Sequence, residues 1–186
     1  MILQDIESAR ERLTGVILKT PLVYSQTLSR WGGREIFLKL ENLQTTGSFK
    51  LRGAVNRLTL LRDRGEGDRV VAASAGNHGQ GVAWAATSLG LKATIVMPRG
   101  ASITKQMACR GYGADLVLSG QNLTESLEKA QELVAQGFIF IHPFDDLEVV
   151  AGQGTLGLEI LEDLPEVDTV VLPVGGGGLA AGTALA

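Results

Sequence analysis

The stretch QTTGSFKLRGA, residues 44–54, contains the lysine around which the rest of the chain is arranged. It places Lys50 in a turn of small and hydroxyl residues, directly before an apolar helical pattern. Most lysines lie on solvated faces as a flexible stem with a hydrated charge. Lys50 instead lies between Phe49 and Leu51, and a lysine that loses water in such a setting has a lowered pKa and can act as a nucleophile or Schiff-base amine. On spacing alone, an ordinary lysine at a helix start is the simpler interpretation.

Outside this stretch, short apolar strands alternate with amphipathic helices. Helices are expected at residues 4–13, 25–31, 54–64, 77–89, 102–109, 123–136, 147–161 and 179–186, and strands at 34–40, 70–73, 92–97, 114–118, 138–141 and 169–172. The alternation indicates βαβ units, so we expect an α/β fold of open, mostly parallel sheets with helices on both faces. Glycines weaken the helical pattern of 147–161. Strand 169–172 is apolar on both faces, so we expect neighbours to cover it.

The composition excludes several classes of protein. The chain has 186 residues, 45% of them apolar, and a net charge of −3, which together indicate one or two small globular domains without a general affinity for nucleic acid. No apolar run reaches membrane-spanning length, and the N-terminus lacks the features of a signal peptide. Cys109 is the only cysteine, so no intrachain disulfide can form and no metal site is expected. We therefore expect a cytoplasmic protein that binds neither nucleic acid nor membrane.

A first glycine-rich stretch, SAGNHGQG at residues 74–81, follows a buried strand and opens a helix. A parallel sheet presents backbone N–H groups to anionic ligands at such a position. Ser74 and Asn77 can add side-chain hydrogen bonds. A simple helix cap in a tight turn is the alternative, and the spacing does not match the dinucleotide fingerprint G-x-G-x-x-G. His78 could act as an acid or base, but a structural donor is the more common role for a lone histidine near a turn.

A second stretch, PVGGGGL at residues 173–179, also lies between a strand and a helix. Four consecutive glycines lose much conformational entropy on folding, so a specific reason for them is expected. A loop whose N–H groups all turn toward one ligand, with a phosphate as the best candidate, would be such a reason. The stretch is not a nucleotide P-loop because no Gly-Lys-Ser/Thr follows. A candidate Schiff-base lysine, an anion loop and a phosphate loop together suit pyridoxal phosphate condensed with an amino acid. A phosphate-binding module in which Lys50 is only a charge is the competing interpretation.

In this order, the three motifs resemble those of fold-type II pyridoxal-phosphate enzymes, most closely the threonine/serine dehydratase and serine racemase group. Residues 46–54 match that group's lysine motif, Thr-Gly-Ser-Phe-Lys-x-Arg-Gly-Ala. The cysteine synthase and threonine synthase branches place Asp-Arg after the lysine, where this chain has Leu51-Arg52-Gly53. AGQGT at 151–155, with Glu159, is also typical of the dehydratases. The resemblance covers the whole chain and implies a tryptophan synthase β-like fold.

The resemblance implies a role for each motif. Lys50 would bind the cofactor as a Schiff base and later move the Cα proton of the substrate, and Phe49 would pack beside the cofactor ring. Asn77 would donate a hydrogen bond to the phenolic oxygen of the ring. The substrate carboxylate would be held by Ser74, Ala75, Gly76, Asn77 and His78. The cofactor phosphate would be held by the N–H groups of Gly175, Gly176, Gly177, Gly178 and Leu179.

The implied reaction is the β-elimination of L-threonine or L-serine to a 2-oxo acid and ammonia, by a homo-oligomer. The racemases have a second serine where this chain has Ala75, which has no proton to give, so elimination is favoured over racemisation. Family members continue beyond the glycine loop, so residues 1–52 and 149–186 are expected to form part of the large cofactor domain, in a chain shortened at its C-terminus. Residues 53–148 would form the complete small domain. The alternatives are a non-catalytic remnant that folds through its small domain and a serine racemase-like enzyme.

Overall fold

The computed structural model describes residues 1–186 and contains a four-stranded parallel sheet of order β5-β4-β3-β6. The strands are β3 (Arg69–Ala73), β4 (Lys92–Met97), β5 (Asp115–Leu118) and β6 (Ile139–Phe140). Val70 of β3 is in register with Ala93 on one side and Ile139 on the other. From β3 the chain adds β4 and β5 in one direction and then returns to place β6 on the opposite side of β3. The strand order therefore switches between β3 and β6.

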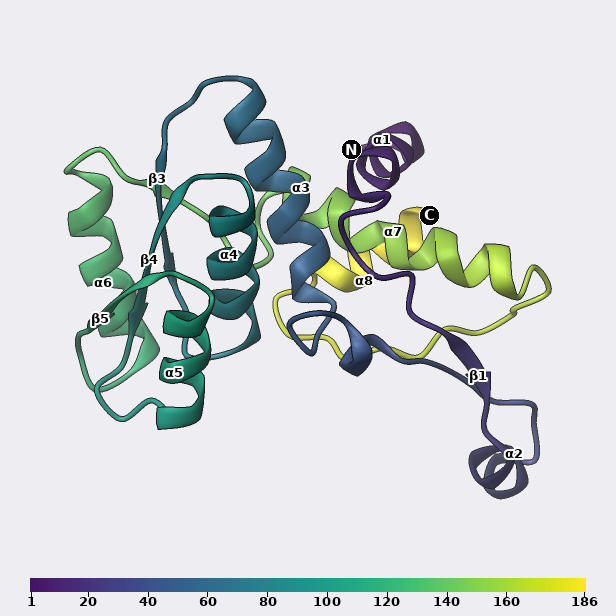
Figure 1. Cartoon of the computed structure of the whole chain (residues 1–186). Coiled ribbons are helices and arrows are strands. Elements are labelled where there is room, and N and C mark those ends of the chain that lie inside the picture. Colours follow the sequence, from purple (N-terminus) through teal and green to yellow (C-terminus); the bar gives the residue numbers. More distant parts are fainter.

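Helices cover both faces of this sheet (Figure 1). Helices α4 (Asn77–Ser88) and α5 (Ile103–Gly111) lie on one face, and α6 (Leu123–Val134) lies on the other. Because side chains alternate along a strand, Val70 of β3 enters the main apolar core and Val71 packs into a smaller cluster with Ala130 of α6. The predicted α/β fold class, with a parallel sheet between helices, is confirmed.

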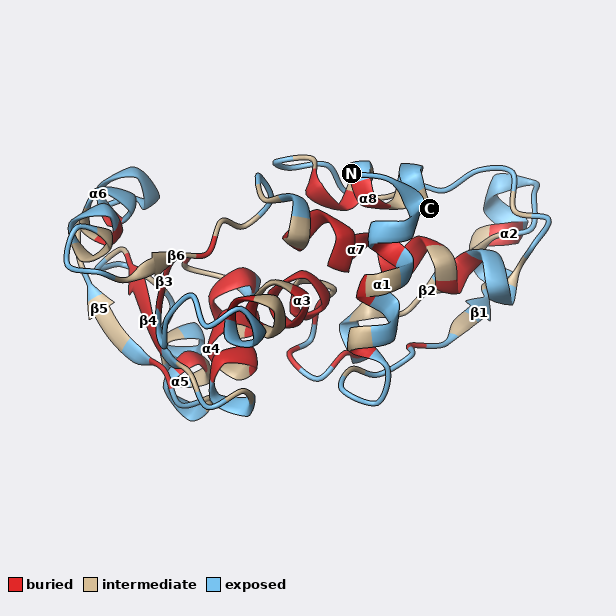
Figure 2. Ribbon diagram, turned by 90° about the horizontal axis from the view of Figure 1, so that it is seen from above, coloured by how far each residue is buried: buried red, intermediate tan, exposed pale blue.

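A second group of helices packs beside this unit. Helix α3 (Lys50–Asp63) runs between the sheet side and a group formed by α1 (Leu3–Leu13), α7 (Leu147–Asp163) and α8 (Gly178–Leu185). Figure 2 shows buried residues along most of α3 and α7, because both helices are covered from several sides.

The glycines of α7 allow it to approach its neighbours closely. A Cβ at Gly152 would lie 2.6 Å from Cα of Gly53 in α3, and one at Gly154 would lie 2.8 Å from the carbonyl oxygen of Gly182 in α8. Contacts this close leave no room for a side chain. The glycines that weaken the helical pattern in the sequence are therefore the ones that allow α3 and α8 to pack closely on α7. Helix α7 is nevertheless unbroken over its 17 residues.

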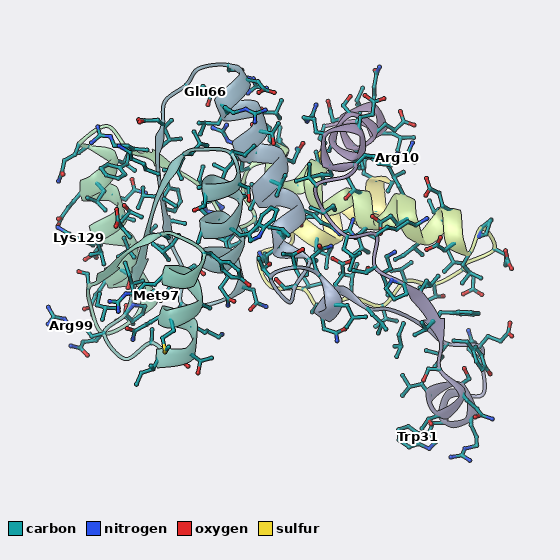
Figure 3. All side chains as sticks on the ribbon, viewed as in Figure 1. Arg10, Trp31, Glu66, Met97, Arg99 and Lys129 are labelled. Atoms are coloured by element: carbon teal, nitrogen blue, oxygen red, sulfur yellow. The ribbon has the colours of Figure 1, made fainter.

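Residues 22–39 project away from the rest of the molecule (Figure 1). Strands β1 (Leu22–Tyr24) and β2 (Phe37–Lys39) form an antiparallel pair, and α2 (Gln26–Gly32) lies between them in the chain. The short helix η1 (Glu41–Leu43) follows β2. Trp31 lies at the far end of this projection and is 73% exposed (Figure 3). The expected strand at 34–40 is thus reduced to three residues.

The predicted strand at residues 169–172 is wrong. Its backbone makes no hydrogen bond within the chain, and Val171 is 92% exposed. An apolar segment becomes a strand only when another segment pairs with its N–H and C=O groups, and neither sheet of this chain reaches it. None of the helices is long and apolar enough to cross a lipid bilayer.

Candidate active site

The predicted anion loop lies at the switch point of the sheet. Ligands of open α/β sheets bind outside the carboxyl ends of the strands where the strand order reverses. Residues 74–78 leave the carboxyl end of β3, and residues 141–145 leave the carboxyl end of the adjacent strand, β6. The two segments touch, since His78 Nε2 donates a hydrogen bond to the Ile141 carbonyl at 2.9 Å.

His78 joins the two strand ends as a neutral donor. Its side chain is 4% exposed. Burial, with smaller contributions from Lys50 and His142, lowers the pKa of His78 to about 4, although its bond to the Ile141 carbonyl acts in the opposite direction. The ring is therefore uncharged at neutral pH. This contact favours a structural role for the His78 side chain over a role as an acid or base. The backbone N–H of His78 is still part of the predicted anion loop.

Several donors of the loop at residues 74–77 are free. The Ser74 hydroxyl oxygen accepts a hydrogen bond from Gly76 N–H at 3.2 Å, so the hydroxyl keeps its own proton for donation. The Ala75 N–H donates to no acceptor within the chain. The first N–H groups of α4, beginning with Asn77, have no partner in their own helix. The Asn77 side chain is exposed, so this edge can receive an anion.

Lys50 is the first residue of α3 and lies against α4 and the segment that follows β6. A Cβ at Gly81 of α4 would lie 3.3 Å from the Lys50 carbonyl oxygen, so α4 packs directly on the first turn of α3. The Lys50 ammonium donates to the Pro143 carbonyl at 2.7 Å and lies 5.4 Å from the ring centre of Phe49. Burial lowers the pKa of Lys50 below its ordinary value. The structure thus confirms that this lysine is partly desolvated.

The tetraglycine loop, Gly175–Gly178, lies against Phe144. A Cβ at Gly176 would lie 2.1 Å from the Phe144 ring, and one at Gly178 would lie 3.1 Å from the Phe144 backbone. Gly177 has a φ of 89°, which strongly favours glycine. The sequence attributes all four glycines to a ligand, whereas three of them are required by the chain's own packing and conformation. Around Gly175, in contrast, a Cβ would meet nothing within 4 Å.

The tetraglycine loop also has free donors and is near the lysine turn. The N–H groups of Gly175, Gly176 and Gly177 donate to no acceptor within the chain. Leu179, which follows the loop, forms a small apolar cluster with α7, and Phe49 packs against that cluster. The three motifs of the sequence therefore converge on the side chains of Phe49 and Lys50.

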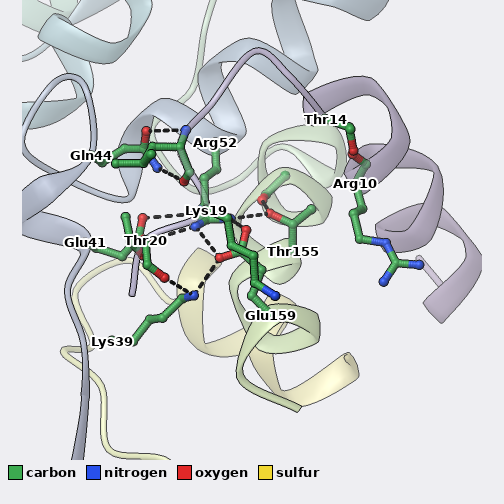
Figure 4. A network of polar contacts seen from close by, with 12 residues as sticks. Arg10, Thr14, Lys19, Thr20, Lys39, Glu41, Gln44, Arg52, Thr155 and Glu159 are labelled. Atoms are coloured by element: carbon green, nitrogen blue, oxygen red, sulfur yellow. Dashed lines mark hydrogen bonds and ion pairs between the residues drawn. The ribbon is translucent and has the colours of Figure 1, made fainter. Parts of the chain in front are cut away.

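A buried ion network anchors the first turn of α3 (Figure 4). The Arg52 guanidinium, fully buried, donates to both carboxylate oxygens of Glu159 at 2.6 and 2.9 Å, and to both oxygens of Glu41 at 2.9 and 2.8 Å. Burial acts to lower the pKa of Arg52, but the two carboxylates outweigh it and raise that pKa. Arg52 remains charged, and it ties the Lys50 turn to α7 and to the segment before the turn.

Reasoning from the sequence missed the segment that touches every motif. Pro143 and Phe144 contact Lys50 and the tetraglycine loop, as described above. Lys105 of α5 is also nearby, because its ammonium would lie 3.5 Å from a Cβ at Gly76. A signal was available: His142-Pro143-Phe144 follows a predicted strand, as residues 74–78 do, and polar or aromatic residues at that edge of a parallel sheet are candidates for a site.

Comparisons with known proteins identify the family. The family model described as "Pyridoxal-phosphate dependent enzyme" matches residues 13–186. The L-threonine ammonia-lyase of Thermotoga maritima is 52% identical over 185 residues, which cover 99% of this chain and 46% of that protein. The catabolic L-threonine dehydratase TdcB of Escherichia coli is 50% identical, over 99% of this chain and 56% of that protein. The chain thus spans about half the length of these relatives.

Solved structures agree with this family. Serine racemase from Dictyostelium discoideum superposes with a TM-score of 0.93 at 40% identity, over 100% of this chain and 61% of that one. Threonine deaminase isoform 2 from Solanum lycopersicum superposes with a TM-score of 0.92 at 43% identity, over 98% of this chain and 50% of that one. The predicted family and its cofactor are confirmed, whereas the roles of individual residues stay predictions.

Proposed function

The chain belongs to the pyridoxal-phosphate dependent enzymes, and we propose that it binds this cofactor through Lys50 and eliminates the β-hydroxyl group of L-threonine or L-serine. The observation that carries the proposal is the position of Lys50. Its partly desolvated amine lies 2.7 Å from the Pro143 carbonyl oxygen, in the segment 141–145, and this segment contacts both the tetraglycine loop and the loop at residues 74–78. The names of the two curated relatives described above support threonine as a substrate.

The residues of the site fit pyridoxal phosphate. Its aldehyde needs an amine that loses its proton readily, which the burial of Lys50 favours. Its phosphate needs N–H donors near a helix N-terminus, which the tetraglycine loop and the first turn of α8 supply. We assign Phe49 to the face of the ring, Asn77 to its phenolic oxygen, and Gly175–Leu179 to its phosphate.

The protein's part in the reaction is to bind, orient and move protons. When bound, the cofactor supplies an electron sink for the pair left at Cα. The residues 74–78 hold the substrate carboxylate through Ser74 Oγ and backbone N–H groups. The Lys50 amine takes the proton from Cα, and orientation of that C–H bond toward Nζ supplies much of the rate. The Cβ–O bond would then break, and the hydroxyl group would leave as water with the proton that Lys50 took from Cα. The released enamine would react with water to give a 2-oxo acid and ammonia.

Racemisation is the second candidate, because serine racemases are among the solved structures that superpose on this chain. Racemisation requires an acid on the face of Cα opposite Lys50. Ala75, in the proposed carboxylate loop, has a methyl group and no proton to give. We therefore favour elimination. In a form of full family length, Ala75→Ser is expected to raise racemisation relative to elimination, and an unchanged ratio would count against this assignment of the loop.

We propose further that residues 1–52 and 149–186 belong to the large cofactor domain and residues 53–148 to the small domain. The sheet and its helices support a separate small unit (Figure 1). The unpaired, apolar segment at 169–174 supports association with a second copy, since unpaired backbone invites pairing. A reduced, buried Cys109 is compatible with the proposed cytoplasmic location.

The test of the proposed activity is 2-oxo acid release from L-threonine by the chain with pyridoxal phosphate, with Lys50→Ala as the matched control. We expect 2-oxobutanoate and ammonia in equal amounts from the wild-type chain and none above background from Lys50→Ala. A wild-type chain that binds the cofactor at Lys50 but releases no product would instead support the non-catalytic alternative. Equal release by both proteins would overturn the role of Lys50.

A further inference from the structure

Residues Ile141–Asp145, here called the strap, join β6 to α7 and hold two parts of the proposed site together. The Pro143 carbonyl accepts the hydrogen bond of the Lys50 ammonium at 2.7 Å. The next residue, Phe144, lies so close to Gly176 that no side chain larger than hydrogen fits there. The position of one short backbone segment therefore sets the place of the lysine amine and of the tetraglycine loop at the same time.

The shape of the strap depends on the His142 imidazole. His142 Nδ1 accepts hydrogen bonds from Asp145 N–H at 2.7 Å and from Phe144 N–H at 3.3 Å. Because both partners are donors, Nδ1 carries no proton, and the proton of the neutral ring is on Nε2. The ring also makes an edge contact with Phe144, at 4.6 Å between centroids. One side chain thus holds the N–H of the Pro143–Phe144 peptide unit, whose carbonyl faces Lys50, and the N–H of the next peptide unit.

We propose that His142 is a positioning residue for Lys50: by accepting two backbone hydrogen bonds it fixes the turn that directs the Pro143 carbonyl at Lys50 and the Phe144 ring at the tetraglycine loop. This inference rests on the proposed function of Lys50 as the cofactor lysine. His142 acts through the strap, so its contribution is geometric. What it provides is an acceptor for N–H groups two and three residues ahead.

An asparagine can provide the same acceptor. Its side-chain oxygen commonly accepts from backbone N–H groups two and three residues ahead, in Asx-turns and helix caps. His142→Asn therefore keeps the hydrogen bonds, whereas His142→Leu removes the acceptor and keeps an apolar side chain. Asn122→Leu is a matched control outside the proposed site, because Asn122 accepts in the same way from Glu125 N–H at 3.0 Å at the start of α6.

The first measurement is the capture of pyridoxal phosphate by the full chain, quantified after borohydride reduction as pyridoxyl-Lys50. Loss of two hydrogen bonds is expected to weaken capture by His142→Leu about tenfold. Capture by His142→Asn is expected to stay within about threefold of the wild-type value. Capture by Asn122→Leu is expected to equal the wild-type value, although this variant should unfold more readily because it loses a helix cap. Equal capture by His142→Leu and wild type, or a failure of Asn to restore it, would overturn the inference.

The second measurement needs no cofactor. Competitive acetylation over a pH series reports the titration of each lysine, with the exposed Lys92 as the main reference and the partly exposed Lys129 as a second reference. The strap helps to keep water from the Lys50 amine, so His142→Leu is expected to move the titration of Lys50 toward that of the references, and His142→Asn to leave it in place. An unchanged Lys50 profile in His142→Leu would contradict the inference. If wild type captures no cofactor, the proposed function fails, and this titration still decides the role of His142.

Discussion

The two loops proposed to bind anions are held in different ways. The loop at residues 74–78 follows β3, which pairs with a strand on each side, and its own members are tied: Ser74 N–H to Val96 O at 3.0 Å, and His78 to the strap. The tetraglycine loop follows residues 169–172, whose backbone pairs with nothing in the chain. It is held from its other end, by Phe144 and by the packing of α8 on α7.

This difference separates two routes to a binding loop. The sheet fixes the first loop by long-range strand pairing, so its free donors are arranged before any ligand arrives. The second loop is fixed by helix packing and one aromatic contact, so its geometry depends on glycines that admit close neighbours. Mutations at the two loops should therefore have different consequences, and Lys50, which lies between them, should respond to both.

The largest expected effect comes from removing Arg52, which anchors the first turn of α3 and so the position of Lys50. Arg52→Met leaves the partly buried Glu41 carboxylate without its cation, and leaves Glu159 with Lys39, at 2.7 Å, as its only remaining cation. Breaking a buried pair by removing one partner costs about 3–5 kcal/mol. Urea unfolding should show this loss. Arg10→Met breaks an exposed pair with Glu162 and should cost less than about 1 kcal/mol. Similar losses for the two variants would show that the network does not anchor α3.

An intermediate effect should appear at the sheet-held loop as the pH falls. His78 has a pKa of about 4 when folded and an ordinary value near 6.5 when unfolded. Between these values the unfolded state binds more protons, so stability falls as the pH is lowered from 6.5 to 4, by about 3 kcal/mol in total. The variant His78→Gln retains a hydrogen-bond donor at this position but does not titrate there. Between pH 6.5 and 4, its free energy of unfolding should therefore fall less than that of the wild type, by about that amount. Parallel profiles for the two proteins would contradict the assignment.

The smallest expected effect is local to the helix-held loop. Gly176→Ala forces a Cβ onto the Phe144 ring and should destabilise the chain by about 1–3 kcal/mol, whereas Gly175→Ala should be nearly neutral because nothing lies within 4 Å. Thermal unfolding measures both variants. Phe144→Ala should relieve most of the strain in the double mutant, giving a coupling within the range of 0.5–3 kcal/mol for residues in contact. Additive effects would mean that the loop does not rest on Phe144.

Much of the site could be predicted because its chemistry is local in the sequence. Lys50 and the two glycine stretches each follow a strand-like apolar run or open a helix, and these patterns depend on neighbouring residues only. The spatial relation between them is not local. That β6 returns beside β3, and so brings Pro143 to Lys50, follows from strand order, which residue patterns do not specify.

The wrong strand, and the roles that the sequence left unassigned, have their physical cause in contacts between distant parts of the chain. The apolar run 169–172 has strand propensity, but a strand also needs a partner, and none lies beside it in this chain. The glycines of α7 lower helix propensity, yet tertiary contacts with Gly53 and Gly182 require them. Arg52 is conspicuous in the lysine motif, but its role as a buried anchor depends on Glu159, which is 107 residues away in the sequence.

The most direct test of the central claim is to locate the cofactor on the chain. The full chain is incubated with pyridoxal phosphate, reduced with borohydride, digested and mapped by mass spectrometry, with Lys50→Ala beside it. The proposed function predicts a pyridoxyl group on Lys50 in preference to the other lysines, including Lys105, and no comparable modification in the variant. A label spread evenly over exposed lysines, with Lys50 unmodified, would contradict it.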